Sequence, residues 1–397
     1  MPLLAGVDAE GSVDPIVARR VARAWLTGGL VGLPTETVYG LSADAQDAEA
    51  VGRIYAVKGR PADHPLIVHV QGSQALAGWS LGPNPAAERL ADAFWPGALT
   101  LVVRRSHRAS DLITGGQDTV ALRCPDHRVA LACLRALADE SGDPARGVAA
   151  PSANRFGRVS PTRAWDVLDE VGARMDPARD LVVDGGPCRI GVESTIVDCT
   201  ADPPRVLRLG AISQDEVDAV LATPAPEGAA APTTAVDAAI RPSVPAAVRA
   251  PGTLEAHYSP HARVVLVERS AAGPQVTELA GAGEPPPRVA DDARDPCRLR
   301  TLEGQEPAPI TDLAEGGEGG EGGEVGLIAP ADVTTPAGWT RLSAPGTGEE
   351  YARGLYAALR LADELGLATV VAVLPNEAGG ALAQAVRDRL ARAAHGD

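Results

Sequence analysis

Five short polar clusters in the first half of the chain hold most of the side chains that could do chemistry. Each cluster falls at the end of a predicted strand or in a turn. They are PTETVYG (34–40), KGRP (58–61) with two nearby histidines, Arg123, PSAN (151–154) with SPT (160–162), and ESTIVD (193–198) with Arg208. Taken singly, each has a structural explanation, since hydroxyls cap turns and cations suit helix C-termini. Together they predict a basic, hydroxyl-lined cleft suited to a nucleotide and a small amino acid.

Lys58 is the only lysine among 36 basic residues, in a chain otherwise rich in arginine. Two interpretations stay open at this point. Lys58 is the lysine left by chance, or the position needs a compact ammonium that a guanidinium cannot imitate. Lys58 carries its charge on a compact ammonium, and Arg60, two residues further on, carries its charge on a planar guanidinium. The two groups together suit a polyphosphate. No second lysine exists for a Walker A motif, so P-loop NTPases are excluded.

The bulk composition limits the class of protein. The net charge is −16, of which −3 belongs to residues 1–210 and −13 to residues 211–397, so a grip on nucleic-acid phosphates is not expected. Five cysteines without a CxxC pair indicate reduced thiols and no zinc site. The sequence contains no run of about 18 apolar residues, so no membrane span is predicted. Residues 1–14 show no secretory signal. These features predict a cytoplasmic enzyme.

The elements that position the polar clusters mix helices and strands without strict alternation, which predicts an α/β fold with a mixed, twisted sheet. Helices are expected at 16–27, capped by Asp14 and Pro15, and at 47–57, 85–94, 127–138 and 162–171. Strands are expected at 30–33, 66–70, 99–103, 119–123, 148–150, 181–183, 194–198 and 205–209.

A second, smaller domain is expected after an Ala/Pro-rich linker. Its predicted strands are 263–268, 325–328 and 368–374, and its predicted helices are 348–364 and 378–394, which suggests a small open α/β unit. Between them, the Gly-Gly-Glu repeat at 315–324 predicts a surface loop. The predicted boundaries are 14–221 for the first domain, 222–262 for the linker and 263–397 for the second domain.

The clusters occur in an order that resembles a known family. PTETVYGL, KGRP with PLIVH, ALRCP, APSAN with SPT, ESTIVD and LRLG are similar to the YrdC-like catalytic domain of threonylcarbamoyl-AMP synthases, over residues 14–221. APGT (250–253) and HYSP (257–260) resemble the linker of the family's long form, which adds a Rossmann-like C-terminal domain.

The resemblance implies a reaction in which L-threonine, bicarbonate and ATP give threonylcarbamoyl-AMP and pyrophosphate, with magnesium. A separate transferase would then use the product to modify tRNA. The resemblance assigns a threonine pocket to Thr37, His69, Arg123, Ser194 and the backbone of Ala150. It assigns the ATP site to Lys58, Arg60, His64, Thr119, Ser152, Asn154, Ser160, Arg208 and Tyr258, with Lys58 and Arg60 as catalytic residues. His64 stands where many members have asparagine.

Two alternative functions share part of this sequence pattern. Carbamoyl transferases of the hydrogenase-maturation type share the one domain, but they also carry zinc-finger cysteines and an acylphosphatase-like segment, which this sequence lacks. A YrdC-like module that binds structured RNA without catalysis fits poorly with an acidic chain that keeps the KGR and SAN residues. The sequence therefore favours the synthase.

Overall fold

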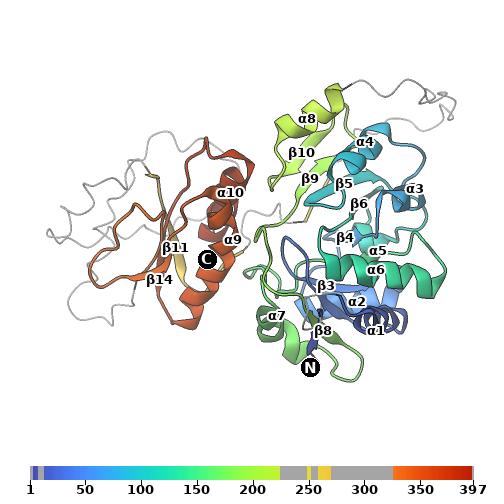
Figure 1. The fold of residues 1–397 in the computed structure, drawn as a ribbon, viewed down its shortest axis with the longest axis horizontal. Coiled ribbons are helices and arrows are strands. Elements are labelled where there is room, and N and C mark those ends of the chain that lie inside the picture. The colour runs from blue at the N-terminus through green and yellow to red at the C-terminus, as the bar shows by residue number, and fades with distance from the viewer. Residues whose placement is uncertain (1–2, 8–12, 224–247, 252–257, 270–324, 396–397) are drawn as a thin grey trace.

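The structure is a computed structural model that describes residues 3–7, 13–223, 248–251, 258–269 and 325–395. The described residues form two sheets, one of ten strands and one of four (Figure 1). The large sheet belongs to the first half of the chain and the small sheet to the second. The Gly-Gly-Glu repeat and residues 224–247 of the linker lie outside the described residues, and the predicted domain boundaries stay a prediction.

The large sheet is mixed, which confirms the prediction from the sequence. Its strand order is β1-β8-β2-β3-β7-β4-β6-β5-β9-β10. β4 pairs with β6 in parallel, whereas β5 pairs with β6 antiparallel. The strands are β1 (Leu3–Ala5), β2 (Val31–Leu33), β3 (Gly40–Asp44), β4 (Ile67–His69), β5 (Leu99–Arg104), β6 (Thr119–Arg123), β7 (Val148–Ala149), β8 (Leu181–Asp184), β9 (Thr195–Asp198) and β10 (Arg205–Arg208).

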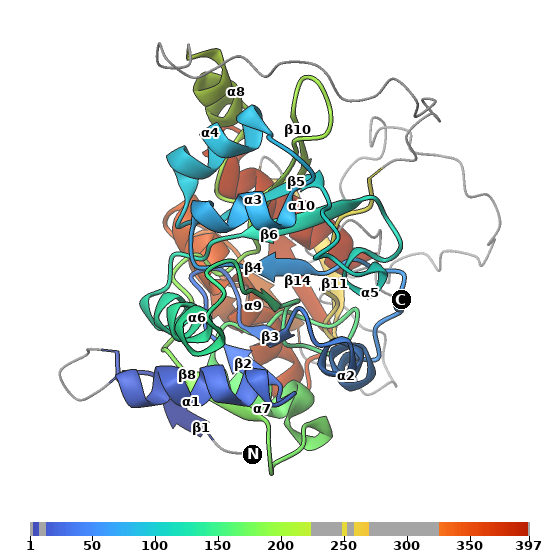
Figure 2. The ribbon, with the colours of Figure 1, turned by 90° about the vertical axis from the view of Figure 1, so that its right-hand side faces the viewer.

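Helices cover this sheet, and Figure 2 shows α1 and α6 packed side by side. The helices are α1 (Pro15–Leu26), α2 (Ala48–Lys58), α3 (Leu76–Trp79), α4 (Pro85–Phe94), α5 (Asp111–Thr114), α6 (Arg128–Ser141), α7 (Ala164–Val171) and α8 (Gln214–Ala222). As predicted, α1 begins with Pro15 after Asp14, whose side chain accepts a hydrogen bond from the Ile16 amide. α2 ends at Lys58 because Gly59 adopts the left-handed conformation, with φ of 64°.

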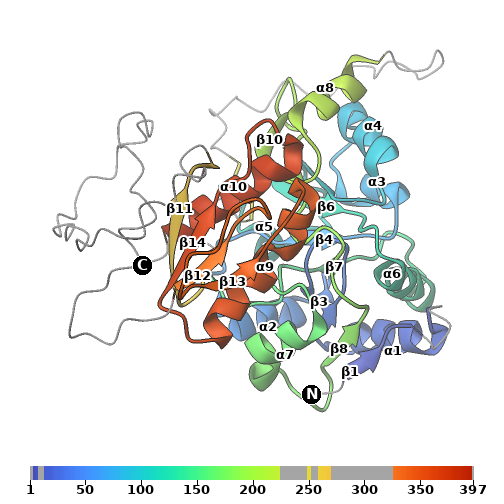
Figure 3. The same ribbon diagram turned by 60° about the vertical axis from the view of Figure 1, so that its left-hand side comes forward.

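The small sheet is entirely parallel, in the order β11-β14-β12-β13, and matches the predicted open α/β unit. Its elements are β11 (Arg263–Val267), β12 (Val325–Ile328), β13 (Thr340–Ser343), α9 (Gly348–Glu364), β14 (Thr369–Val373) and α10 (Gly380–Ala394). Both helices pack on the sheet face that carries Val370 and Ala372 (Figure 3).

The helices α9 and α10 also form the contact between the two halves of the chain. In Figure 1 they lie between the small sheet and the first domain. One apolar cluster joins Leu355 and Val386 of these helices to Val38, Val159 and Val192 of the first domain. Because this core is shared, the second domain packs directly against the loops that carry the predicted site.

A buried aspartate holds the start of β2, the strand that leads into the PTETVYG segment. One carboxylate oxygen of Asp180 accepts a hydrogen bond from the Leu30 amide at 2.8 Å, and the other lies 2.5 Å from an Arg53 nitrogen. The Asp180 side chain is fully buried. Breaking a buried pair leaves the other charge uncompensated, which is far more costly than losing an exposed pair.

We therefore expect Asp180→Ala to lower the free energy of unfolding by about 3–5 kcal/mol. The neighbouring Arg179→Ala is the control, because Arg179 forms a half-exposed ion pair with Asp176 and should cost less than about 1 kcal/mol. Urea unfolding of both variants measures the difference. Equal losses of unfolding free energy in the two variants would show that the burial of Asp180 does not determine its contribution to stability.

Candidate functional site

One cleft in the first domain brings together residues from all five polar clusters. Its walls come from the segment after β2, from the loop after α2, from β4, from the ends of β6 and β10, from the loop after β7, from the turn before β9 and from the linker. The lining residues are Thr35, Thr37, Val38, Gly40, Arg60, Ile67, His69, Arg123, Ala150, Pro151, Ser152, Glu193, Ser194, Arg208, Pro251 and Tyr258. The predicted basic, hydroxyl-lined cleft is therefore present.

Arg123 ends β6 and reaches back to the PTETVYG segment. One of its terminal nitrogens donates to the Thr37 hydroxyl at 2.7 Å, and the other lies 2.7 Å from the Glu36 carboxylate. The Thr37 hydroxyl is in turn 3.0 Å from that of Thr35. Both charged side chains are almost completely buried. A carboxylate that enters the cleft must therefore share the Arg123 guanidinium with Glu36.

His69 lies beside Arg123 because the two residues are register partners in the parallel pair β4–β6. Burial, followed by the positive charge of Arg123, lowers the pKa of His69 to about 3. Its Nδ1 atom is buried and has no hydrogen-bond partner. The imidazole is therefore neutral at physiological pH.

Lys58 is buried just behind the cleft wall instead of lining it. Its ammonium donates to the backbone carbonyl of Ser152 at 2.5 Å and to that of Asn154. Burial, followed by the nearby Arg60, lowers the pKa of Lys58 well below its usual value. In this structure Lys58 fastens the PSAN turn, so its direct action is on the position of Ser152 and Asn154.

Two arginines with buried guanidinium groups present positive charge to the cleft. Arg60 donates to the Pro65 carbonyl at 2.9 Å, and burial lowers its pKa to about 10, so it stays charged at neutral pH. Arg208 donates to the Ser194 carbonyl at 3.0 and 3.1 Å and to the Pro251 carbonyl at 2.8 Å. These are the lining groups best suited to an anion.

Glu193 lines the same cleft and was not assigned a role from the sequence. Its carboxylate accepts hydrogen bonds from Ser160 at 2.7 Å, from Tyr356 at 2.9 Å and from Arg389 at 3.0 Å. Burial alone would raise the pKa of Glu193, but the charges of Arg389 and Arg208 lower it to about 2. The carboxylate is therefore ionised. No local sequence signal reveals this, because Tyr356 and Arg389 lie more than 160 residues away in the chain.

Tyr258 brings the linker into the cleft wall. Its ring stacks on Tyr356 with centroids 5.5 Å apart, and the Arg389 guanidinium lies 5.4 Å from the ring centroid. Tyr258 has a φ of 66°, the left-handed region that side chains other than glycine rarely adopt. Such a conformation persists only where the surroundings hold it, and here both neighbours come from the second domain.

Nine of the residues predicted from the sequence line the cleft, and five do not. The five are Lys58, His64, Thr119, Asn154 and Ser160. Three of them lie directly behind the wall: Lys58 through Ser152, Ser160 through Glu193, and Asn154 in a turn where its amide donates to the Arg155 and Arg158 carbonyls. His64 packs edge-on against Phe156, and Thr119 lies at the opposite end of β6 from Arg123. The binding roles of all fourteen residues stay predictions.

Comparison with known families divides the chain into two matched parts. A family model described as "Telomere recombination" (Sua5, YciO and YrdC) matches residues 23–210. A second, described as "Threonylcarbamoyl-AMP synthase, C-terminal domain", matches residues 212–395. Together the two models span almost the whole chain.

Individual relatives are similar over more limited stretches. The threonylcarbamoyl-AMP synthase of Pyrococcus abyssi is 42% identical over 254 residues, covering 63% of this chain and 67% of the relative. That of Bacillus subtilis is 44% identical over 216 residues, covering 54% and 59%. The crystal structure of P. abyssi Sua5 complexed with L-threonine superposes with a TM-score of 0.75 at 33% identity, covering 99% of this chain and 98% of that one.

The neutral, buried His69 predicts a pH dependence of stability. Below pH 6.5 the unfolded chain protonates this histidine, whereas the native chain does not until about pH 3. The stabilisation is therefore complete above pH 6.5 and is lost as the pH falls. We expect the free energy of unfolding to fall by about 1–2 kcal/mol more in the wild-type chain than in His69→Gln between pH 6.5 and 5.

Urea unfolding at the two pH values measures this difference. Ordinary carboxylates titrate below this pH range. The contributions of the other histidines are the same in both proteins and cancel in the comparison. The exposed His107→Gln serves as the control and should keep the wild-type fall. A fall in His69→Gln as steep as that of the wild type would show that His69 takes up its proton over the same pH range in the native and unfolded states.

Proposed function

This chain belongs to the threonylcarbamoyl-AMP synthase family, and from that premise we propose that it makes threonylcarbamoyl-AMP and pyrophosphate from L-threonine, bicarbonate and ATP. The observation that carries the proposal is the single cleft that joins a buried arginine–threonine–histidine group to two further cleft-lining arginines. The first group suits an amino acid, and the two arginines suit a polyphosphate. The relative solved with L-threonine superposes over nearly the full length of both chains.

The threonine end of the cleft would bind the carboxylate and leave the amine reactive. The Arg123 guanidinium offers its planar fork to the carboxylate, beside the hydroxyl of Thr37. The Ser194 hydroxyl, 2.7 Å from that of Thr100, and the Ala150 backbone complete this end. The amine must be unprotonated to capture carbon dioxide as a carbamate. His69 is neutral and adds no charge at this end of the cleft.

The nucleotide end would hold ATP so that the carbamate oxygen meets the α-phosphorus in line with the leaving group. A new oxygen–phosphorus bond forms, the bond from the α-phosphorus to the bridging oxygen breaks, and pyrophosphate leaves with the electron pair. Such a transfer depends on positioning and on charge stabilisation. Arg60 and Arg208 supply the positive charge, while Lys58 holds the turn that presents Ser152.

Magnesium is proposed to enter with the nucleotide. Among the described residues, no three histidine, cysteine, aspartate or glutamate side chains lie together in a way that would hold a metal ion. Mg²⁺ commonly binds through substrate phosphates and keeps several waters, so a protein cage is not required. When bound, it would offset the charge of the phosphates; the ion-paired Glu193 would not be a ligand.

The product is proposed to pass to a separate transferase that modifies tRNA, in the cytoplasm. Within the described parts of the chain, no helix has the length and apolar character needed to cross a membrane. The net charge of −16 disfavours binding to nucleic-acid phosphates, so we expect the transferase to bind the tRNA.

Mass spectrometry of the product tests the proposal directly. With threonine, bicarbonate and ATP, the full chain should form threonylcarbamoyl-AMP, and pyrophosphate release should depend on threonine.

Lys58→Arg should lose most of this synthesis, because a guanidinium is too wide for the enclosed site between the Ser152 and Asn154 carbonyls. Pyrophosphate release that is independent of threonine, or full activity in Lys58→Arg, would contradict these expectations.

Arg123→Ala is expected to raise the apparent KM for threonine by at least about ten-fold while changing that for ATP by less than about three-fold. The reason is that Arg123 contacts the threonine end only, beside Thr37 and Glu36. Arg105→Ala is a matched control, because Arg105 follows β5 and pairs with Asp111 outside the cleft. Equal changes for both substrates would show that the threonine pocket has been placed wrongly.

A further inference from the structure

We propose that Arg389, on α10 of the second domain, is a positioning residue of the ATP site, which it serves by neutralising Glu193. This inference rests on the proposed function and concerns the same cleft. Arg389 does not line the cleft, and its side chain is fully buried between the two domains. Its Nε donates to Glu193 at 3.0 Å, and a terminal nitrogen donates to the Leu209 carbonyl at 2.8 Å.

The need for Arg389 follows from the charges that line the cleft. The charged lining residues are Arg60, Arg123, Glu193 and Arg208. Arg123 is paired with Glu36, so Arg60 and Arg208 are the cations left for phosphate. An unpaired Glu193 carboxylate would repel the phosphates and compete for Arg208. With Arg389 bound to Glu193, that competition is removed.

Glu193 also links the position of α10 to Ser160, which is predicted to contact ATP. One carboxylate oxygen binds the Ser160 hydroxyl at 2.7 Å, while the other binds Arg389 and the Tyr356 hydroxyl. A shift of Arg389 would therefore move Ser160, which is assigned to the ATP site.

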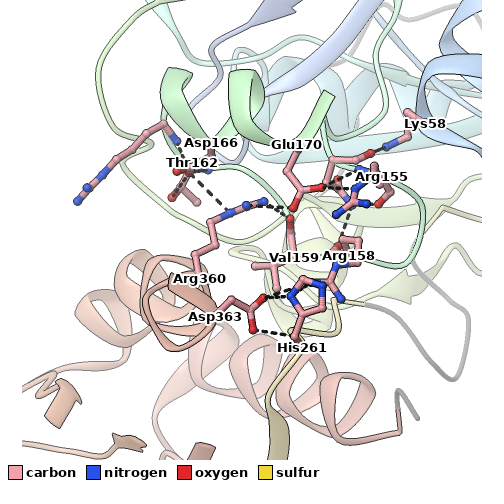
Figure 4. Close-up of polar contacts among 12 residues, drawn as sticks. Lys58, Arg155, Arg158, Val159, Thr162, Asp166, Glu170, His261, Arg360 and Asp363 are labelled. Atoms are coloured by element: carbon pink, nitrogen blue, oxygen red, sulfur yellow. Dashed lines mark hydrogen bonds and ion pairs between the residues drawn. The ribbon is translucent and has the colours of Figure 1, made fainter. Parts of the chain in front are cut away.

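A second arginine from the same domain supports the adjoining loop. Figure 4 shows Arg360 of α9 directed at Glu170 and Val159, and Asp363 beside His261 and Arg158. Arg360 lies 3.1 Å from the Glu170 carboxylate and also donates to the Val159 carbonyl, next to Ser160. The loop that presents Ser160 is thus held from the second domain on both sides. Asp363 binds Arg158, whose carbonyl accepts a hydrogen bond from Asn154, so this contact supports the same loop.

The test is calorimetric binding of a non-hydrolysable ATP analogue and, separately, of L-threonine to the full chain. Arg389→Met should weaken binding of the analogue by at least about ten-fold, because it leaves a buried carboxylate unpaired beside the phosphates, and should change the threonine Kd by less than about three-fold. Arg389→Lys keeps the positive charge and should bind the analogue within about three-fold of the wild type.

The double variant Glu193→Gln/Arg389→Met removes the unpaired charge and keeps an acceptor for Ser160. It should recover most of the analogue affinity that Arg389→Met loses, even if the single variant is poorly folded. Thermal unfolding is recorded for every variant. Arg387→Met is the control, because Arg387, also on α10, contacts Glu268 and Pro375 within the second domain. This control should bind the analogue as the wild type does.

Three results would overturn the inference. They are wild-type affinity for the analogue in Arg389→Met, equal losses for analogue and threonine, and no recovery in the double variant. Because the readout is binding, it stays separate from the proposed activity. A wild-type chain that binds the analogue but makes no threonylcarbamoyl-AMP would refute the activity and leave the role of Arg389 intact.

Discussion

A buried carboxylate at the wall of an anion-binding cleft is the constraint on which much of this structure depends. Glu193 is ionised and buried, and an ion in that position is tolerated only when it is paired and hydrogen-bonded. The first domain supplies Ser160 and the nearby Arg208, but the direct ion pair comes from Arg389. The second domain is therefore held against the cleft by the electrostatic requirement of a residue in the first.

Burial also explains why the cations of the site are arranged as they are. Burial lowers the pKa of both Lys58 and Arg60, and the positive charge of Arg60 lowers that of Lys58 further. The Lys58 ammonium donates to backbone carbonyls behind the cleft wall, whereas arginines line the cleft. A compact donor fits between two close carbonyls, and a planar guanidinium suits an anion. The retention of one lysine in an arginine-rich chain has a physical reason here.

Local patterns predicted most elements, but not the contacts between distant ones. The Asp14–Pro15 start of α1 and the whole of β6 could be predicted because capping residues and apolar strands are local signals. The sequence did not predict β3, because Gly40–Asp44 is buried throughout and shows no alternation. It also did not predict β1, β13, α3, α5 and α8. The clustering of five polar motifs predicted the cleft. The pairing of Glu193 with Arg389 could not be predicted, because it joins residues 196 positions apart through the packing of two domains.

The linker residue Tyr258 depends on the same side chains of the second domain that bind Glu193. Tyr258 keeps a backbone conformation that is unfavourable for a tyrosine, and its ring lies against Tyr356 and Arg389, the two residues that also bind Glu193. The cleft wall, the linker and the second domain thus share one set of contacts. Because packed contacts of this kind change together, any displacement of Tyr258 also disturbs the partners of Glu193. The position of Tyr258 and the charge balance at the cleft wall are consequently coupled through Tyr356 and Arg389.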